Sequence, residues 1–435
     1  MFFTPSASGK TIISEIEFEE YKLANGLHVI LHEDKSNPLV SLDIWYHVGS
    51  KDEEADRTGF AHLFEHMMFQ GSANVGKSEH FKYIQEAGGI VNGSTTQDRT
   101  NYLETVPSNK LELVLWLESD RMGTLAVTQE NFDNQREVVK EEKRQRYDNA
   151  PYGSRFYNLF NKSFGNHPYG WIPIGSMKDL DNADLRYAQN FYKKFYAPNN
   201  AVLVISGDID YRHTKKLVEK YFADLKPSEV KNKSFPEAVF NKGEIKDTIY
   251  DNVQLPAVYT AYKIPGLQSN DIYSLNLLSV ILADGKSSRL YNDIVHNKKL
   301  AKSINSLVWK LELAGLLIIS AMGFRNSSLS EIGKHIDENL DKIIASGVSE
   351  DELIKAKNKL ENNLVNHKQT TLGIADRLAY FRTFYNNTNM INSEQSRYQN
   401  VSINDVKEAA QKYLSKNNRV VLHYLPVNKP NAGVN

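Results

Sequence analysis

Two imidazoles and a carboxylate fall within five residues of this chain, in the run His62-Leu63-Phe64-Glu65-His66. In a helix, offsets of three and four residues bring side chains onto one face, so these three groups would converge. Two imidazoles one turn apart can bind one Zn²⁺, and a carboxylate between them can act as general base on a water that the metal activates. The order of the residues is that of the inverted zinc-peptidase motif.

The residues around this motif are apolar. Thr58-Gly59-Phe60-Ala61 precedes it and Met67-Met68-Phe69 follows it, which predicts a helix that is at least partly buried. Histidines and a glutamate in such a setting need partners. The setting therefore favours a metal site over the alternative, which is two surface histidines beside a glutamate.

Composition limits the other function classes. A chain of 435 residues is long enough for two domains of about 200 residues each. A formal net charge of −1 without a long basic block argues against nucleic acid or an anionic membrane as the main partner. Because there is no cysteine, a bound zinc must use histidine and carboxylate ligands. No phosphate-cradling glycine loop or nucleophilic serine elbow is present.

The N-terminal residues have no signal-peptide pattern, and no apolar run reaches membrane-spanning length. On this basis we expect a soluble protein without a membrane span, located in the cytoplasm or the periplasm.

The chain repeats its plan once. Pro38-Leu39-Val40 recurs in the second half as Pro256-Ala257-Val258, and residues 195–202 recur at the same spacing as residues 413–420. We therefore predict an α+β fold of two homologous domains in tandem, each with a mostly antiparallel or mixed sheet packed with helices. The predicted boundaries are a zinc-binding catalytic domain at 1–228, a polar linker at 229–245 and a homologous non-metal domain at 246–435.

The same spacing shows what the second domain lacks. His62, Glu65 and His66 fall on Val280, Ala283 and Asp284. Only the first domain is therefore expected to hold the metal.

Hydrophobic periodicity predicts the elements of the first half. We expect a hairpin that turns at Asn25-Gly26 and a strand at 40–48. After the motif helix follow a helix at 79–87, a polar strand at 90–106, helices at 111–122 and 132–147, and a strand at 202–205 with a helix to about 222.

A third zinc ligand is expected on the helix at 132–147, since hydrolytic zinc normally keeps three protein ligands and one open position. Val138 and Glu142 are four residues apart on its predicted apolar face, with Gln135 and Arg146 on the same side. A buried glutamate beside valines is costly unless it meets a cation. Periodicity thus favours Glu142 as the ligand, and the alternative is a solvated glutamate paired with Arg146.

Over nearly its whole length the chain resembles the pitrilysin/insulinase family of zinc metallopeptidases, which includes the mitochondrial processing peptidase. In that family a ligand glutamate follows the motif at a characteristic distance along the chain, and the spacing from His66 to Glu142 agrees with it. The resemblance implies a Zn²⁺ cofactor held by His62, His66 and Glu142, with Glu65 as general base. Further family-like runs are residues 63–72, 98–102, 148–153 and 197–200.

The resemblance also implies a substrate-binding strand. Family members bind the peptide as an added strand along an Asn-Ala-x-Thr type sequence, and Asn92, Gly93, Ser94 and Thr95 occupy those positions here, with glycine in place of alanine. Pairing through the main chain would explain broad specificity. On sequence alone, the same run is equally well an exposed polar edge strand that is protected against aggregation.

Two departures from the family pattern matter. Gln135 stands where many members have a second glutamate, so it is expected at most to hydrogen-bond near the ligands. In many members the second domain supplies an arginine and a tyrosine to the substrate carbonyl, but Val295 and Lys302 stand at those positions. The loss of each such donor typically raises the activation free energy of the reaction by about 3 kcal/mol.

We therefore expect a homologous, non-zinc partner subunit to supply the arginine and tyrosine, as in family members built from two half-length chains. The predicted function is a zinc metalloendopeptidase that acts on short or unfolded peptides as the zinc-bearing subunit of a heterodimer. A precursor-processing subunit that cleaves targeting sequences is an alternative with the same chemistry. A non-catalytic scaffold subunit is less favoured, because all four metal-site residues are present.

Overall fold

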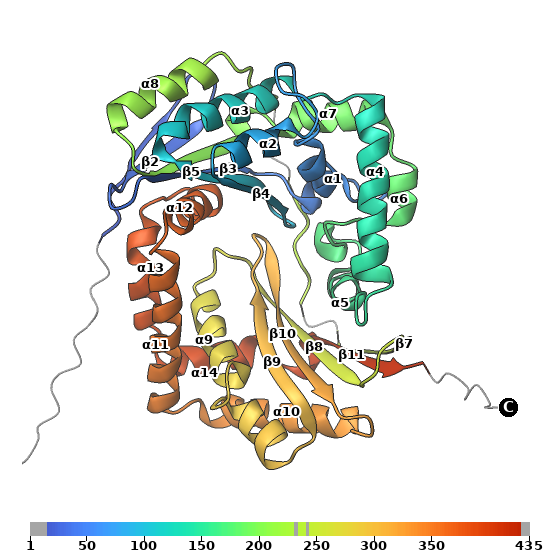
Figure 1. Ribbon diagram of the computed structural model, residues 1–435. Helices are drawn as coiled ribbons and strands as arrows, with labels where there is room; N and C mark the ends of the chain where they lie inside the picture. Colours follow the sequence, from blue (N-terminus) through green and yellow to red (C-terminus); the bar gives the residue numbers. More distant parts are fainter. Residues whose placement is uncertain (1–14, 230–233, 241–242, 428–435) are drawn as a thin grey trace, which may run out of the picture.

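The computed structural model describes residues 15–229, 234–240 and 243–427, which form two halves, each a sheet packed with helices (Figure 1). The first sheet has the order β1-β2-β6-β3-β5-β4, from β1 (Glu19–Lys22), β2 (His28–Glu33), β3 (Leu39–Tyr46), β4 (Ile90–Thr95), β5 (Thr100–Pro107) and β6 (Ala201–Gly207). The second has the order β7-β11-β8-β10-β9, from β7 (Ile245–Asp251), β8 (Ala257–Pro265), β9 (Ala301–Trp309), β10 (Ala314–Gly323) and β11 (Arg419–Pro426).

Both sheets are mixed, because β2 and β6 pair in parallel, as do β7 and β11, while the other pairs are antiparallel. The helices of the first half are α1 (Phe60–Met67), α2 (Glu79–Glu86), α3 (Leu111–Thr124), α4 (Gln129–Lys143), α5 (Arg155–Phe164), α6 (Met177–Asp181), α7 (Leu185–Phe195) and α8 (Tyr211–Phe222). Those of the second are α9 (Asp271–Ala283), α10 (Leu329–Ser346), α11 (Glu350–His367), α12 (Thr371–Tyr385), α13 (Met390–Gln399) and α14 (Ile403–Tyr413).

The internal repeat is visible in the elements themselves. α7 and α14 begin and end with the spacing of the sequence repeat, and β6 and β11 begin with that spacing as well. The strand order β2-β6-β3-β5-β4 of the first sheet recurs as β7-β11-β8-β10-β9 in the second. The predicted fold class, an α+β fold of two related halves, is confirmed. The domain boundaries stay a prediction, and β7 already begins at Ile245, inside the predicted linker.

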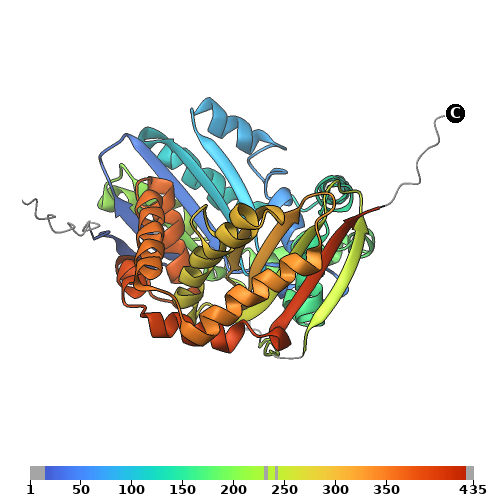
Figure 2. The same cartoon turned by 90° about the horizontal axis from the view of Figure 1, so that it is seen from below.

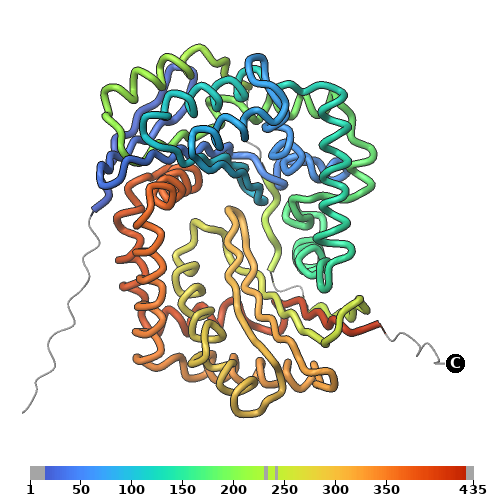
Figure 3. The backbone as a smooth tube through the Cα atoms, viewed as in Figure 1, coloured from blue at the N-terminus to red at the C-terminus, as the bar shows by residue number. Residues whose placement is uncertain are grey.

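The halves meet on two sides. In Figures 1 and 3, α11–α13 rise to the first sheet on one side, and α4 and α5 descend towards the second sheet on the other. α12 packs on β3 and β6, where Leu378 and Phe381 share an apolar core with Trp45 and Val204. α9, α10 and α14 cover the outer face of the second sheet, seen from below in Figure 2. The opposite face of that sheet is turned towards α5.

One predicted element differs in the structure. The polar strand expected at 90–106 is a hairpin of β4 and β5, closed where the Thr96 N–H donates to the Arg99 carbonyl at 2.8 Å. Residues 92–101, from β4 through the turn into β5, include no large apolar side chain, so hydrophobic alternation gave no sign that the chain reverses there. As a result β4 lies at the edge of the sheet.

Candidate metal centre and substrate cleft

α1 presents the two motif histidines from one face. Its apolar side chains, Phe60, Ala61, Leu63, Phe64 and Met67, are buried in the first half, which leaves the face with His62 and His66 turned away from the core. The two rings lie 4.9 Å apart between centroids. The periodicity of the motif therefore produces the convergence that its spacing predicts.

The start of α1 is held by a buried carboxylate. The backbone N–H groups of Gly59 and Ala61 donate to Glu53 at 3.0 and 2.8 Å. These are groups that a helix N-terminus otherwise leaves without partners. Gly59 has φ +100°, a left-handed conformation that glycine adopts at no steric cost. The helix therefore begins at a defined point, shortly before the first histidine.

α4 brings Glu142 to the two histidines. The buried residues of this helix are Asn131, Phe132, Gln135 and Val139, whereas Val138 is 42% exposed. The prediction that Val138 shares the apolar face was wrong by one position, because the helix packs through Val139, three residues before Glu142. The Glu142 carboxylate still reaches α1, with Oε2 at 3.7 Å from His62 Nε2 and 3.3 Å from His66 Nε2.

These three groups fit a zinc ion. One ligand atom from each of His62, His66 and Glu142 lies within 4.8 Å of the other two. Ligands around a tetrahedral zinc with bonds of about 2.0–2.1 Å lie about 3.3 Å apart. The observed separations are close to that value, and imidazole and carboxylate are the donors that hydrolytic zinc sites use.

The ionisation of His62 and Glu142 is also suited to a cation. Burial lowers the pKa of His62 to about 4, so its ring is neutral at pH 7 and can offer a lone pair. The hydrogen bond with the His66 ring lowers the pKa of Glu142, which keeps this carboxylate ionised. Arg146 also donates to Glu142 Oε1 at 2.7 Å, so the arginine pairing considered from sequence exists beside the histidine contacts.

Glu65 points from α1 to the edge strand β4. Its Oε2 accepts a hydrogen bond from the Thr95 hydroxyl at 2.6 Å. Burial raises the pKa of Glu65, although the Thr95 hydrogen bond opposes the shift. A carboxyl whose pKa moves towards neutrality is better suited to take up a proton. Gly93 makes room for it, since a Cβ there would lie 3.2 Å from Glu65 Cγ.

The four residues of the predicted substrate strand line a cleft of about 530 Å³, here named the zinc cleft, whose lining also includes His62, Glu65, His66 and Glu142. Arg99 braces the strand by donating to the Ser94 carbonyl at 2.7 Å. The opposite wall was not found from sequence, and it consists of Tyr147, Phe156, Ile172, Pro173, Ile174 and Trp309. These are scattered apolar and aromatic residues of loops and of helix and strand ends, which carry no motif.

Among the described residues, the Gln135 side chain has no hydrogen bond to His62, His66 or Glu142. It is buried on α4, and its amide donates to Asn134 at 2.8 Å. Its predicted place beside the metal site stays a prediction.

A second cluster with potential metal ligands, His80, Glu104 and Glu118, is buried in the first half. The guanidinium of Arg121 pairs with both glutamates, at 3.2 Å from Glu104. A buried arginine already supplies the positive charge that these carboxylates require. We therefore regard this cluster as a structural ion network.

The second half has no histidine at the positions that correspond to His62 and His66. Asp284, which corresponds to His66, forms an ion pair with Lys359 at 2.6 Å, and Val280 lies beside it in the same small cavity. Val295 packs against the core of the second half, and neither it nor Lys302 lines the zinc cleft. Arg289 is held by Glu352 at 2.6 Å. Among the described residues that line the cleft, Trp309 alone comes from the second half.

Known proteins show the same organisation. The model of the insulinase family (peptidase family M16) matches residues 28–179, and that of the peptidase M16 inactive domain matches residues 183–360. Zinc protease PqqE of Helicobacter pylori is 29% identical over 91% of this chain and 90% of its own length. The uncharacterized zinc protease YmxG of Bacillus subtilis is 25% identical over 81% of this chain and 85% of its own length. The crystal structure of a protease from Helicobacter pylori superposes with a TM-score of 0.89 at 28% identity, over 95% of this chain and 100% of that one.

Fold and centre together define the class of a metallopeptidase. The chain belongs to the insulinase family, peptidase family M16, and it is a zinc protease of that family. Within the described residues, none of the helices has the length and apolar character needed to cross a membrane.

Proposed function

We propose that this zinc protease is an endopeptidase for short or unfolded peptides, in which His62, His66 and Glu142 hold the zinc. The observation that carries the proposal is the approach of the Glu142 carboxylate to both imidazoles, at 3.7 and 3.3 Å. When bound, zinc supplies the Lewis acidity that allows water to attack a peptide carbonyl near neutral pH.

Glu65 is proposed as the general base. Thr95 occupies its Oε2 at 2.6 Å, which leaves Oε1 to accept the proton of the attacking water. The same carboxyl can then donate that proton to the leaving amine. Its raised pKa, caused by burial, supports both transfers at neutral pH.

The substrate is proposed to bind as an extended strand beside β4. Hydrogen-bonded pairs alternate along an antiparallel ladder. Since Thr96 bonds to Arg99 across the turn, the next bonded pair is Ser94 with Asn101, and the backbone groups of Gly93 and Thr95 are directed to the open edge. A peptide that pairs with them is read through its main chain, so broad side-chain specificity is expected.

A homologous partner subunit without zinc is proposed to complete the site. Arg146 lines the cleft, but Glu142 engages its guanidinium at 2.7 Å. The second half contributes the Trp309 side chain and, among the described residues, no cationic group to the cleft lining. An arginine and a tyrosine from a related chain would supply the missing donors to the substrate carbonyl.

The test measures cleavage of a fluorogenic extended peptide by the zinc-loaded chain. The chain is assayed alone and together with the homologous partner subunit that carries the arginine and the tyrosine. We expect the pair to cleave about a hundredfold faster or more, since one oxyanion donor is worth that factor. Glu65→Gln in the pair should retain stoichiometric zinc and lose about a thousandfold in kcat.

Full cleavage by the pure single chain would refute the partner requirement. Full cleavage by Glu65→Gln would refute the assignment of the base. Retained zinc in Glu65→Gln is the control that separates lost chemistry from a lost metal site.

A further inference from the structure

A cavity of about 610 Å³ lies between α5 and the inner face of the second sheet. Pro151, Tyr152, Arg155 and Phe156 line it from the first half. From the sheet come Tyr259, Asn305, Ser306, Leu307, Ile318, Ser320 and Met322. The described lining contains one charged side chain, Arg155, and no aspartate or glutamate.

This cavity continues the zinc cleft. Phe156 lines both spaces, and its ring packs on Trp309 with centroids 5.0 Å apart. Trp309 and Leu307 are two residues apart on β9 and therefore face the same side of the sheet. A peptide that leaves the cleft past the Phe156–Trp309 pair would meet the cavity within about two residues, at about 3.3 Å per extended residue.

Arg155 has no carboxylate partner among the described residues. Its Nη1 donates to the Tyr152 carbonyl at 2.9 Å, and its guanidinium lies over the Phe156 ring at 4.4 Å. The carboxylate of Asp251, which lies near this segment, instead accepts the N–H groups of Tyr152 and Asn252. The remaining guanidinium donors are therefore free to meet a ligand.

Two further features favour an anion in this cavity. Arg155 and Phe156 form the first turn of α5, where the helix dipole is positive. Ser320 donates to Asn305 Oδ1, which leaves the exposed Asn305 amide nitrogen as a donor on the facing sheet.

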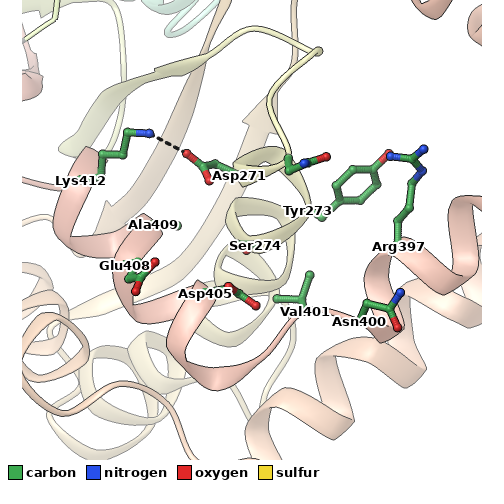
Figure 4. Close-up of a pocket in the computed structure, with 11 residues that line it drawn as sticks. Asp271, Tyr273, Ser274, Arg397, Asn400, Val401, Asp405, Glu408, Ala409 and Lys412 are labelled. Carbon is green, nitrogen blue, oxygen red and sulfur yellow. Dashed lines mark hydrogen bonds and ion pairs between the residues drawn. The ribbon is translucent and has the colours of Figure 1, made fainter.

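Another cavity shows the contrast. The space of about 420 Å³ between α9, α13 and α14 contains charges of both signs (Figure 4). There Lys412 pairs with Asp271 at 2.9 Å, and Asp405 and Glu408 add negative charge. That cavity therefore contains carboxylates that can pair with its cationic side chains, whereas the lining of the one beside the zinc cleft offers Arg155 no carboxylate.

We propose that Arg155 is a specificity residue, which binds a carboxylate side chain of the substrate a few residues from the scissile bond. The inference rests on the proposed endopeptidase function, because it places one peptide across both spaces. It predicts a preference for acidic peptides that backbone pairing along β4 would not produce.

The test measures binding, so that it does not depend on turnover. The peptides are labelled, ten residues long and uncharged except at one position, where each carries Glu, Gln or Lys. That position is moved along the peptide in turn. Each peptide is titrated into the full-length, zinc-loaded Glu65→Gln chain. At one or two positions on one side of the scissile bond we expect Glu to bind about tenfold more tightly than Gln at low ionic strength. This ratio should decrease as salt is added.

Arg155→Gln, added to this background, should reduce the ratio to about one, and Arg155→Lys should restore part of it. Arg155→Glu should make the Lys peptide the preferred one. Arg212→Gln, which removes an exposed arginine on α8, is the matched control and should leave the ratio unchanged.

Equal binding of Glu and Gln peptides at every position would overturn the inference, as would a preference that persists in Arg155→Gln. Either result leaves the endopeptidase proposal standing, since that depends on cleavage by the wild-type pair. If no peptide is cleaved by that pair, the proposed function fails instead.

Discussion

Glu65 and Glu142 are glutamates in one cleft, yet their pKa values move in opposite directions. Burial raises the pKa of Glu65, while the hydrogen bond with His66 lowers that of Glu142. Environments that separate the pKa values of two carboxyl groups assign them different tasks. The carboxyl with the lowered pKa is suited to hold a cation, and the one with the raised pKa is suited to exchange protons.

At this residue scale, Glu142→Gln should weaken zinc binding by about a hundredfold or more, since even the loss of a group that only supports a ligand costs about 10–100-fold. Isothermal titration with zinc measures the effect. The neighbouring Glu141→Gln is the matched control, because Glu141 is exposed and pairs with Arg144 and Gln145 away from the histidines. Equal zinc affinity in the two variants would contradict the assigned ligand.

At the scale of elements, a helix and a strand hold the proposed reacting groups in place. Glu53 holds the first turn of α1, and the Thr95 hydroxyl connects that helix to β4. Because β4 pairs with β5 on one side, its other side can accept a peptide strand.

This strand arrangement predicts an alternating response to substrate modification. In a set of peptides with a single N-methyl group, methylation should weaken binding about fivefold or more at every second residue, where the N–H faces β4. The residues between them should tolerate it, because their N–H groups face away. Fluorescence anisotropy with the zinc-loaded Glu65→Gln chain measures the series. Uniform tolerance, or loss without a period of two, would argue against strand addition.

Some of these elements could be predicted from sequence and others could not. The motif helix and the repeat were predicted correctly, because both depend on local periodicity or on comparison of the chain with itself. The reversal between β4 and β5 was missed, since its turn at Gln97-Asp98 contains neither glycine nor proline. Val138 was placed on the wrong face, because two adjacent valines leave the helix phase ambiguous by one residue.

At the scale of the whole molecule, a buried ion network joins the halves. Glu312 of the second half accepts hydrogen bonds from Lys51 at 2.8 Å and is bonded to His47 at 2.9 Å, both in the first half. Burial alone would raise the pKa of Glu312, but these contacts outweigh it and lower the pKa to about 2. The same loop is tied to Asp98, which accepts the Glu312 N–H at 2.9 Å.

This network predicts an acid-dependent loss of stability. A carboxyl whose pKa is lowered on folding stabilises the protein above its unfolded pKa of about 4.3, and this contribution is lost as the pH falls towards 2. At pH 6, Glu312→Gln should therefore reduce the free energy of unfolding by up to about 3 kcal/mol. The difference from wild type should shrink steadily below pH 4.5.

Urea unfolding at a series of pH values measures that difference. Asp56→Asn, at an exposed carboxylate, should follow wild type at every pH. A Glu312→Gln effect of the same size at pH 3 and pH 6 would show that the network does not depend on this ionised group.

By itself, the sequence determined that two imidazoles and a carboxylate share one turn of helix, since residues three and four apart are neighbours in any helix. It also determined that the second half lacks these groups. Only the tertiary structure decided that Glu142 meets the histidines, that Thr95 holds Glu65, and that Phe156 lines both the cleft and the cavity that contains Arg155. Those contacts join segments far apart in the chain, and their geometry depends on how helices and sheets pack.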